Sequence, residues 1–153
     1  MTNAANIINT IAGQLVIITK KDLIVSCRFI DIDVDKEPEQ INTNREIEKN
    51  IKKYFNGKLK YLPNKLKLEG TAFQLKVYNA IMDIAYGCTK TYKEIAIEIG
   101  HPTACRAVAN ACSSNKLAIF VPCHRVVGAN NIGGYKWGID KKQILLDFER
   151  KNC

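Results

Sequence analysis

One short run of the sequence, residues 121–127 with the letters VPCHRVV, brings a thiol, an imidazole and a guanidinium into three successive positions. Cysteine attacks as its thiolate, and a free thiol at its ordinary pKa is only slightly ionised at neutral pH. A neighbouring base or cation raises the thiolate fraction. Cys123 is therefore a candidate nucleophile and His124 a candidate base, although a Cys-His pair alone does not establish catalysis.

The local backbone decides whether these two side chains can meet. In an extended strand they would point to opposite faces, because neighbouring residues of a strand alternate. A turn after Pro122 would bring them together, and a water molecule between them is the other route. A catalytic histidine also needs an orienting carboxylate, for which Asp147 and Glu149 are both candidates. Arg125 can pair with such a carboxylate inside the fold.

The other cysteines give no sign of a metal site. The chain has six cysteines and two histidines, without any Cys-x-x-Cys pair, so a zinc site would need scattered ligands. In a reducing compartment these thiols stay free. Free cysteines are usually small buried hydrophobic residues, and this is the state expected for Cys27, Cys88, Cys105, Cys112 and Cys153.

Composition places the chain among ordinary globular proteins. Its 153 residues are 46% hydrophobic and 25% charged, without a run of 18 apolar residues that could cross a membrane. The first residues lack the basic leader of a secretory signal, so we expect a cytoplasmic location, or a nuclear one in a eukaryote. The net charge of +8 is compatible with a nucleic acid, with a membrane surface, or simply with solubility.

The first part of the chain predicts strands and one helix. Two runs rich in Ile, Val and Phe, within residues 14–34, are separated by TKKD, a hairpin signal. Residues 43–57 then space Ile47, Ile51, Tyr54 and Phe55 at helical intervals before a glycine. A basic segment with Pro63 follows, and we expect it to be an extended linker containing the domain boundary.

The second part predicts helices. Residues 71–84 and 91–100 each begin with a threonine cap, and residues 101–115 form a third helical segment with Pro102 near its start. The last two segments fit either a helix-turn-helix or an ordinary pair of helices. A glycine-rich loop follows VPCHRVV, and a final amphipathic helix should bury Ile144, Leu145 and Phe148.

Several motifs at their mutual spacing resemble the O6-alkylguanine-DNA alkyltransferases. PCHRV is followed by GGY-x-x-G, a lysine and LL-x-x-E, and is preceded in order by GTAFQLKVYNAI, YGCTKTYKEIA and IGHPTACRAVANA. The resemblance runs from Gly70 to Glu149 and is weak before it. The expected fold is α+β: residues 1–66 form a small, variable N-terminal domain with an antiparallel β-sheet and a helix. Residues 67–153 form a helical, winged-helix or helix-turn-helix-like domain that carries the active-site cysteine.

The resemblance implies an enzyme that repairs O6-alkylguanine, and O4-alkylthymine, in DNA. The alkyl group would pass irreversibly to the protein's own cysteine, once per molecule. The implied roles are Cys123 as acceptor, His124 as a base acting through a water molecule, Glu149 as its orienting carboxylate, Tyr92 as proton donor to the leaving base, and Asn115 as a brace of the surrounding segments.

The family binds the minor groove with its helix-turn-helix and flips the damaged base out of the duplex. Here the segment from Thr103 would enter the groove, and Arg106 would replace the flipped nucleotide in the base stack. The small Ala104 and Ala107 would allow close approach. We also expect Tyr92, which would assist rotation of the phosphate, and Arg125 to contact DNA.

Four residues are expected to line the substrate pocket: Val126, Tyr135, Lys136 and Trp137. The bulky Trp137 is expected to narrow the pocket against large groups such as benzyl, which a comparison of methyl and benzyl substrates would test. Tyr78 stands where the family often has a tryptophan, and we expect it in the core.

We expect no cofactor, and no metal, because the ligands of the structural zinc of some members have no evident counterparts. The expected partner is double-stranded DNA containing O6-alkylguanine, bound by a monomer, with cooperative binding open and no membrane contact. One alternative is an alkyltransferase-like protein that binds the lesion without reacting. Others are a cysteine hydrolase with turnover, and a transcription factor that binds undamaged DNA and tolerates Cys123→Ala.

Overall fold

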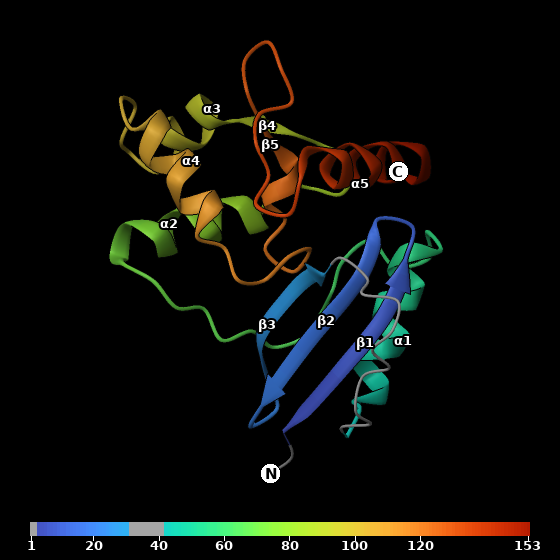
Figure 1. The fold of residues 1–153 in the computed structure, drawn as a ribbon. Helices are drawn as coiled ribbons and strands as arrows, with labels where there is room; N and C mark the ends of the chain where they lie inside the picture. The colour runs from blue at the N-terminus through green and yellow to red at the C-terminus, as the bar shows by residue number, and fades with distance from the viewer. Residues whose placement is uncertain (1–2, 31–41) are drawn as a thin grey trace.

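The computed structural model describes residues 3–30 and 42–153. Within them the strands β1 (Ala4–Thr10), β2 (Gly13–Lys20) and β3 (Leu23–Ile30) form an antiparallel sheet in sequence order (Figure 1). The hairpin expected at TKKD is confirmed. Its tip, Lys21 and Asp22, has φ values of 51° and 64°, as a tight two-residue hairpin turn requires.

Strand β1 was not predicted from the sequence. Alanine and asparagine are poor strand formers, and they make up much of its sequence. The strand pairs with β2 along its whole length, and the amide of its buried Asn6 donates to Asn44 O at 2.9 Å and accepts from Asn44 N at 3.1 Å. The predicted second β-run extended to Val34, but residues 31–34 lie outside the described part of the chain.

Helix α1 (Arg45–Phe55) lies beside the sheet, as expected (Figure 1). Asn44 caps it by accepting hydrogen bonds from two backbone N–H groups of its first turn. Its inner face buries Ile47, Ile51 and Tyr54 in the same core cluster as the inward side chains of the sheet. The predicted helix and its buried face are therefore confirmed.

The edge of β3 joins the sheet to the rest of the chain. Ile24 exchanges backbone hydrogen bonds of 2.9 Å with the linker, through Lys65 O and Lys67 N. Cys27 does the same, at 2.9 Å, with Lys116 O and Ala118 N. The boundary predicted at residue 66 falls in this linker, and buried residues on both sides of it belong to one hydrophobic cluster.

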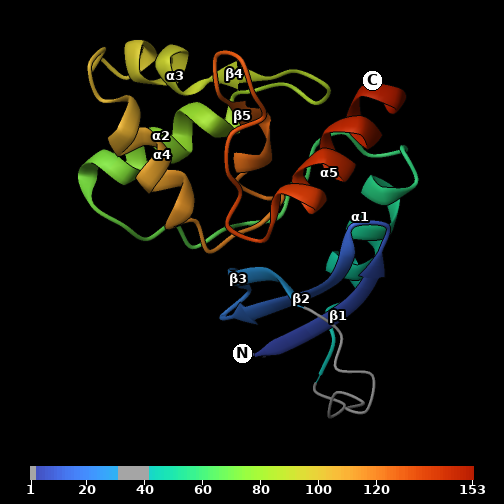
Figure 2. The ribbon, with the colours of Figure 1, turned by 45° about the horizontal axis from the view of Figure 1, so that its top comes forward.

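Helices α2 (Ala72–Met82), α3 (Tyr92–Glu98) and α4 (Cys105–Ser113) of the second part gather away from the sheet (Figure 2). Helices α2 and α3 begin with capping boxes at the predicted threonines. Helix α4 starts later than predicted, because Pro102 lies in the turn before it and not in its first turn. No helix in residues 3–30 and 42–153 is long and apolar enough to span a membrane.

The VPCHRVV run is not a continuous strand. Its middle forms a short 3₁₀ helix, η1 (Cys123–Arg125), and only then the strand β5 (Val126–Val127), which pairs in parallel with β4 (Lys90–Thr91). The chain ends in helix α5 (Ile139–Asn152). The backbone therefore turns directly after Pro122, and Cys123 and His124 do not alternate as neighbours in an extended strand would.

Helix α5 is rotated relative to the predicted amphipathic face. Leu145 is buried as expected, but Ile144 is 37% exposed and Leu146 is buried instead. The inward face of α5 also carries Lys142 and Glu149, both fully buried. The prediction for Ile144 was wrong because two charged side chains, which sequence patterns place outside, occupy the inner face.

Candidate active site

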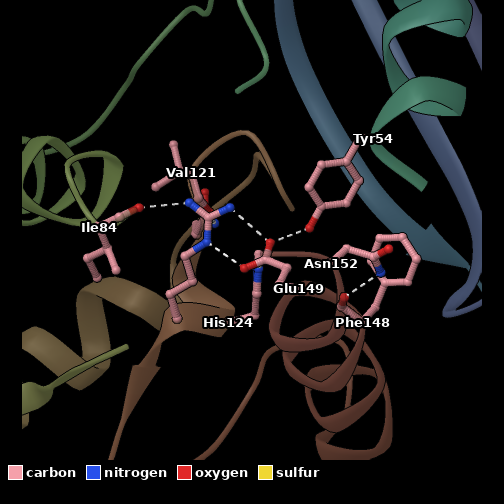
Figure 3. Close-up of polar contacts among 9 residues, drawn as sticks. Tyr54, Ile84, Val121, His124, Phe148, Glu149 and Asn152 are labelled. Atoms are coloured by element: carbon pink, nitrogen blue, oxygen red, sulfur yellow. Dashed lines mark hydrogen bonds and ion pairs between the residues drawn. The ribbon is translucent and has the colours of Figure 1, made fainter. Parts of the chain in front are cut away.

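The carboxylate of Glu149 lies at the centre of a buried polar network (Figure 3). Because η1 turns the backbone, both His124 and Arg125 reach α5. His124 Nε2 lies 2.8 Å from Glu149 Oε2, and Arg125 binds both carboxylate oxygens, with Nε at 2.7 Å from Oε1 and Nη2 at 2.9 Å from Oε2. Asp147, the other candidate carboxylate, is exposed and bonds to Gln143. Glu149 is therefore the carboxylate that orients His124.

Arg125 is directed into the protein. Besides its two bonds to Glu149, its Nη1 donates to Ile84 O at 2.8 Å, and the side chain is buried. A guanidinium held in this way does not reach a DNA backbone. The DNA contact expected for Arg125 is not supported by its position, and its role is to pair with Glu149.

Tyr54 also belongs to this network, although no motif in the sequence indicates it. Its hydroxyl donates a hydrogen bond to Glu149 Oε2, the oxygen that also faces His124 (Figure 3). Helical spacing correctly predicted that Tyr54 is buried. Nothing in a local pattern, however, links a tyrosine of α1 to a glutamate 95 residues later.

The network fixes the charges of its members. Burial raises the pKa of Glu149, but hydrogen bonds from His124 and Arg125 outweigh it and hold that pKa well below its usual range. Burial lowers the pKa of His124, and the opposing effect of Glu149 is smaller. His124 is thus neutral at neutral pH and donates through Nε2–H. Its Nδ1 is buried without a partner among the described residues, so it is the nitrogen available to accept a proton.

Cys123 lies at a pocket of about 290 Å³. The thiol is nearly covered, with 4% of the residue exposed. The pocket is lined by residues from α3, α4, η1 and the glycine-rich loop: Tyr92, Ala109, Cys112, Ser113, Cys123, Gly134, Tyr135 and Lys136. A hydrogen bond with the thiol of Cys112, together with burial, raises the pKa of Cys123 well above its usual value. Cys112 was expected only in the core, and its place in this pocket was not predicted.

Tyr92 reaches the same pocket from the first position of α3. The parallel pairing of β4 with β5 sets Thr91 beside Val127, which brings Tyr92 close to the segment that follows Cys123. Burial raises the pKa of Tyr92, which keeps its hydroxyl protonated and able to donate. A Cβ on Gly133 would lie 2.6 Å from that hydroxyl, so the loop needs glycine there.

Asn115 ties together the segments on either side of Cys123. Its Nδ2 donates to Val121 O at 2.9 Å, and its Oδ1 accepts from Leu117 N at 2.9 Å. Lys136 of the glycine-rich loop donates to Asn115 O at 3.1 Å. This is the geometry of a brace for the chain around the pocket.

The other expected pocket residues lie at different depths. Tyr135 and Lys136 line the pocket, whereas Trp137 borders a neighbouring hollow and packs edge-on against Phe29 and Tyr135 at 6.4 and 5.3 Å between ring centroids. Val126 is buried, and its carbonyl accepts from Lys142 Nζ at 2.6 Å. Trp137 therefore supports the loop from behind Tyr135, and its side chain is not among those lining the Cys123 pocket.

The residues expected to meet DNA lie beside this pocket. Thr103, Arg106 and Ala107 are exposed, and Ala104 is half-buried. Residues three and seven positions apart share a helix face, so Arg106 of α4 lies on the side that lines the pocket through Ala109 and Ser113. An exposed cationic side chain thus lies one helical turn from the pocket wall.

The remaining thiols have mixed environments. Cys27 is buried and Cys105 half-buried, but Cys88 and Cys153 are exposed, so the expectation that they are buried was wrong. Cys88 lies in the turn before β4, and Cys153 follows the last residue of α5. Across residues 3–30 and 42–153, no group of three or more His, Cys, Asp or Glu side chains is placed to hold a metal ion.

Comparison with known proteins agrees with this geometry. Residues 72–151 match the family described as 6-O-methylguanine DNA methyltransferase, DNA binding domain. The chain is 50% identical over 130 residues, 84% of its length and 83% of the relative's, to a probable methylated-DNA–protein-cysteine methyltransferase of Acanthamoeba polyphaga mimivirus. Its fold is similar to that of Mycobacterium tuberculosis O6-methylguanine methyltransferase, with a TM-score of 0.86 and 34% identity, covering 99% of this chain and 94% of that one. The M. tuberculosis protein in complex with DNA gives a TM-score of 0.86 and 33% identity over 98% and 94% of the two chains.

Proposed function

This chain belongs to the 6-O-methylguanine DNA methyltransferase family, and from that membership we propose that Cys123 is the residue that accepts the alkyl group. The function of the chain is direct-reversal DNA repair, as a methylated-DNA–protein-cysteine methyltransferase with DNA as its partner. The substrate we propose is O6-alkylguanine, together with O4-alkylthymine, in double-stranded DNA.

One observation carries the assignment of Cys123. Its thiol borders a pocket that also presents the protonated hydroxyl of Tyr92, and the next residue, His124, is held by a buried carboxylate. Nucleophile and proton donor thus line one cavity of about 290 Å³, and the oriented base is the residue that follows the nucleophile in η1. No other described cysteine has this combination of neighbours.

The proposed reaction is a single displacement at the alkyl carbon attached to O6. The proton of Cys123 passes, through a water molecule, to Nδ1 of His124, and the sulfur then forms a bond to the alkyl carbon. The carbon–oxygen bond breaks, and its electron pair stays with the guanine, which takes a proton from Tyr92. Since the product is a thioether, which water does not cleave, each molecule reacts once.

Because the pKa of Cys123 is raised, its thiol needs a base, and His124 is the base that we propose. A thiol that is buried and hydrogen bonded to Cys112 is mostly protonated at neutral pH, so the attack needs a base. Burial keeps His124 neutral, and Glu149 accepts its Nε2–H, which leaves Nδ1 as the basic nitrogen. Arg125 keeps Glu149 ionised in this buried position.

We propose that a monomer reaches the base from the minor groove through α3 and α4. Flipping a base out of the duplex costs a few kcal/mol of lost stacking, and the planar guanidinium of Arg106 can refill the gap. The exposed positions of Arg106 and Ala107, on the same helix as the pocket wall, and of Thr103 in the turn before that helix support this orientation.

The test is to mix the protein with a duplex that carries one O6-methylguanine and to record the intact mass. The expected gain is one methyl group in place of one hydrogen, on the peptide that contains Cys123. Cys123→Ala should show no gain and still bind the duplex. A methyl group found on another cysteine would refute the assignment of Cys123.

The same experiment separates the alternative of a lesion-binding protein that does not react. That protein would bind the methylated duplex more tightly than the unmodified one, without any change in mass. The presence of a cysteine at position 123, with an oriented histidine beside it, favours the reacting protein.

A further inference from the structure

We propose that Tyr54, in the N-terminal part of the chain, is a positioning residue of the alkyl-transfer site. Its hydroxyl holds the carboxylate of Glu149 in the orientation in which Glu149 holds His124. The inference rests on the proposed function of Cys123 and His124. It also gives the N-terminal domain, for which the motifs imply no role, a part in orienting the base.

The position of Tyr54 is set by its packing and not by the hydrogen bond alone. The side chain is buried in the core, and its ring meets the rings of Phe55, Tyr86 and Phe148 at centroid distances of 4.9, 5.8 and 6.3 Å. Figure 3 shows the hydroxyl directed at Glu149 from the side of α1, across from His124. A hydroxyl on a rigid, enclosed ring fixes the direction of its acceptor.

The two carboxylate oxygens of Glu149 accept different numbers of hydrogen bonds. Oε1 accepts only from Arg125 Nε among the described hydrogen bonds, whereas Oε2 accepts from Tyr54, His124 and Arg125 Nη2. The Tyr54 hydroxyl therefore competes for the oxygen that His124 uses. This donor draws negative charge away from the imidazole as well as fixing the rotation of the carboxylate.

Removing this hydroxyl should make His124 more basic. Without it, more of the carboxylate charge faces Nε2–H, and the protonated form of His124 is favoured. The other charged or titratable groups that face this network are unchanged by the substitution: Arg125 from η1, Lys142 from α5, Tyr86 from the turn before β4, and Tyr135 from the glycine-rich loop.

The variant Tyr54→Phe isolates the hydroxyl, because it keeps the packed ring. The rate of methyl transfer from an excess of O6-methylguanine duplex is measured between pH 5 and 9. The acid limb of this profile, where the rate falls at low pH, reports the protonation of His124. We expect this limb to move to higher pH by roughly 0.5 to 1 unit, since one hydrogen bond is worth about that shift. The rate on the acid limb then falls about 3- to 10-fold, and the plateau at higher pH changes little.

Tyr86→Phe is the matched control. Tyr86 packs on the same ring, and its buried hydroxyl has no hydrogen-bond partner among the described residues. Both variants lose one buried phenol oxygen from one aromatic cluster, but only Tyr54→Phe removes a bond to Glu149. Tyr86→Phe should leave the acid limb where it is in the unmodified protein.

The outcomes separate this inference from the proposed function. If the unmodified protein gains no methyl group, the proposed function fails. If it reacts, and Tyr54→Phe gives the same pH profile, or both variants shift it equally, the inference about Tyr54 is overturned. A loss of rate at every pH without a shift would reduce Tyr54 to a structural residue.

A measurement on the unmodified protein keeps the test independent of the folding of Tyr54→Phe. Proton NMR should show a slowly exchanging hydroxyl proton of Tyr54, with a nuclear Overhauser contact to the ring of His124. The absence of that contact in the folded, active protein would overturn the proposal.

Discussion

At the scale of single residues, Glu149 determines the state of the site. Burying a carboxylate is costly unless it is paired and hydrogen bonded, and Glu149 receives hydrogen bonds from Tyr54, His124 and Arg125. These donors keep it ionised, and it in turn sets which nitrogen of His124 is free. A residue without any contact with the substrate pocket thereby decides whether the thiol has a base.

Replacing Glu149 by glutamine should weaken both the chemistry and the fold. Breaking a buried pair leaves Arg125 without its counter-charge, which typically costs about 3–5 kcal/mol. The pKa of Glu149 is lower in the folded than in the unfolded state, so its stabilisation is present above about pH 4.3 and is lost as pH falls below that value. Urea unfolding between pH 7 and 3 should therefore show a smaller acid loss for Glu149→Gln, by up to about 1.4 kcal/mol per pH unit.

Asp147→Asn is the control for that series. Asp147 lies on the same helix, two residues earlier, but it is exposed. Its substitution should leave the rate of methyl transfer, and the loss of unfolding free energy between pH 7 and 3, close to the values of the unmodified protein. Equal effects of the two substitutions would mean that the acid dependence does not come from the buried network.

The environment of Cys123 predicts low reactivity in the absence of DNA. Its pKa is raised by the contact with Cys112 and by burial, so the thiolate fraction at pH 7 is small and rises with pH. With iodoacetamide at pH 7, followed by peptide mapping, the exposed Cys88 and Cys153 should be labelled before Cys123. In urea, where the chain is unfolded, Cys123 should be labelled as fast as Cys88 and Cys153. Fastest labelling of Cys123 in the native protein would show that its thiolate is already formed.

At the scale of elements, the sequence predicted the helices and the hairpin that local signals, such as capping residues and turn residues, encode. Capping residues and helical periodicity located α1, α2 and α3, and TKKD located the β2–β3 hairpin. It did not predict β1, whose asparagine is satisfied by a residue 38 positions away. Nor did it predict that Lys142 of α5 is buried, because the carbonyl groups that satisfy its Nζ lie on other segments.

The orientation proposed for α4 gives a test with Arg106. Arg106→Ala should slow methyl transfer from duplex DNA at least about 10-fold, because the flipped base is no longer replaced in the stack, and should reduce the salt slope of binding by about one. Transfer from the free base O6-methylguanine, which needs no flipping, should be unchanged. Arg150→Ala, the same charge change at an exposed position of α5, should affect neither. An equal loss with the free base would place Arg106 in the chemistry and not in base flipping.

At the scale of the whole molecule, the site extends over a longer stretch of chain than its motifs. The residues proposed from the motifs lie between Tyr92 and Glu149, where spacing carries the information. Tyr54 enters from α1, because β3 is bonded along its edge to the linker and to the segment after α4. Such a contact depends on how the two parts of the chain pack. No pattern along either part could have predicted it.

The burial of thiols and phenols makes the stability of the whole protein sensitive to high pH. Burial is the main cause that raises the pKa of Cys27, Tyr54 and Tyr135, and it acts with Cys112 on Cys123. In the unfolded chain these groups lose their protons from about pH 9 to 10, whereas in the folded chain they keep them. Their stabilisation is therefore complete below about pH 8.5 and is lost as pH rises, at about 1.4 kcal/mol per pH unit for each group. Burial lowers the pKa of Lys142 to about 8. Between about pH 8 and 10.5 the folded chain has therefore lost this proton while the unfolded chain keeps it, which raises the stability with pH and opposes the loss.

Urea unfolding at pH 8, 9, 10 and 11 should accordingly show a free energy of unfolding that changes little to pH 9 and falls steeply above pH 10. Tyr54→Phe removes one of the groups, so its slope above pH 10 should be smaller by about 1.4 kcal/mol per pH unit. Tyr61→Phe is the control, because Tyr61 is 74% exposed. If the two variants have the same slope, the phenol of Tyr54 is not enclosed in solution, and its hydrogen bond to Glu149 cannot persist there.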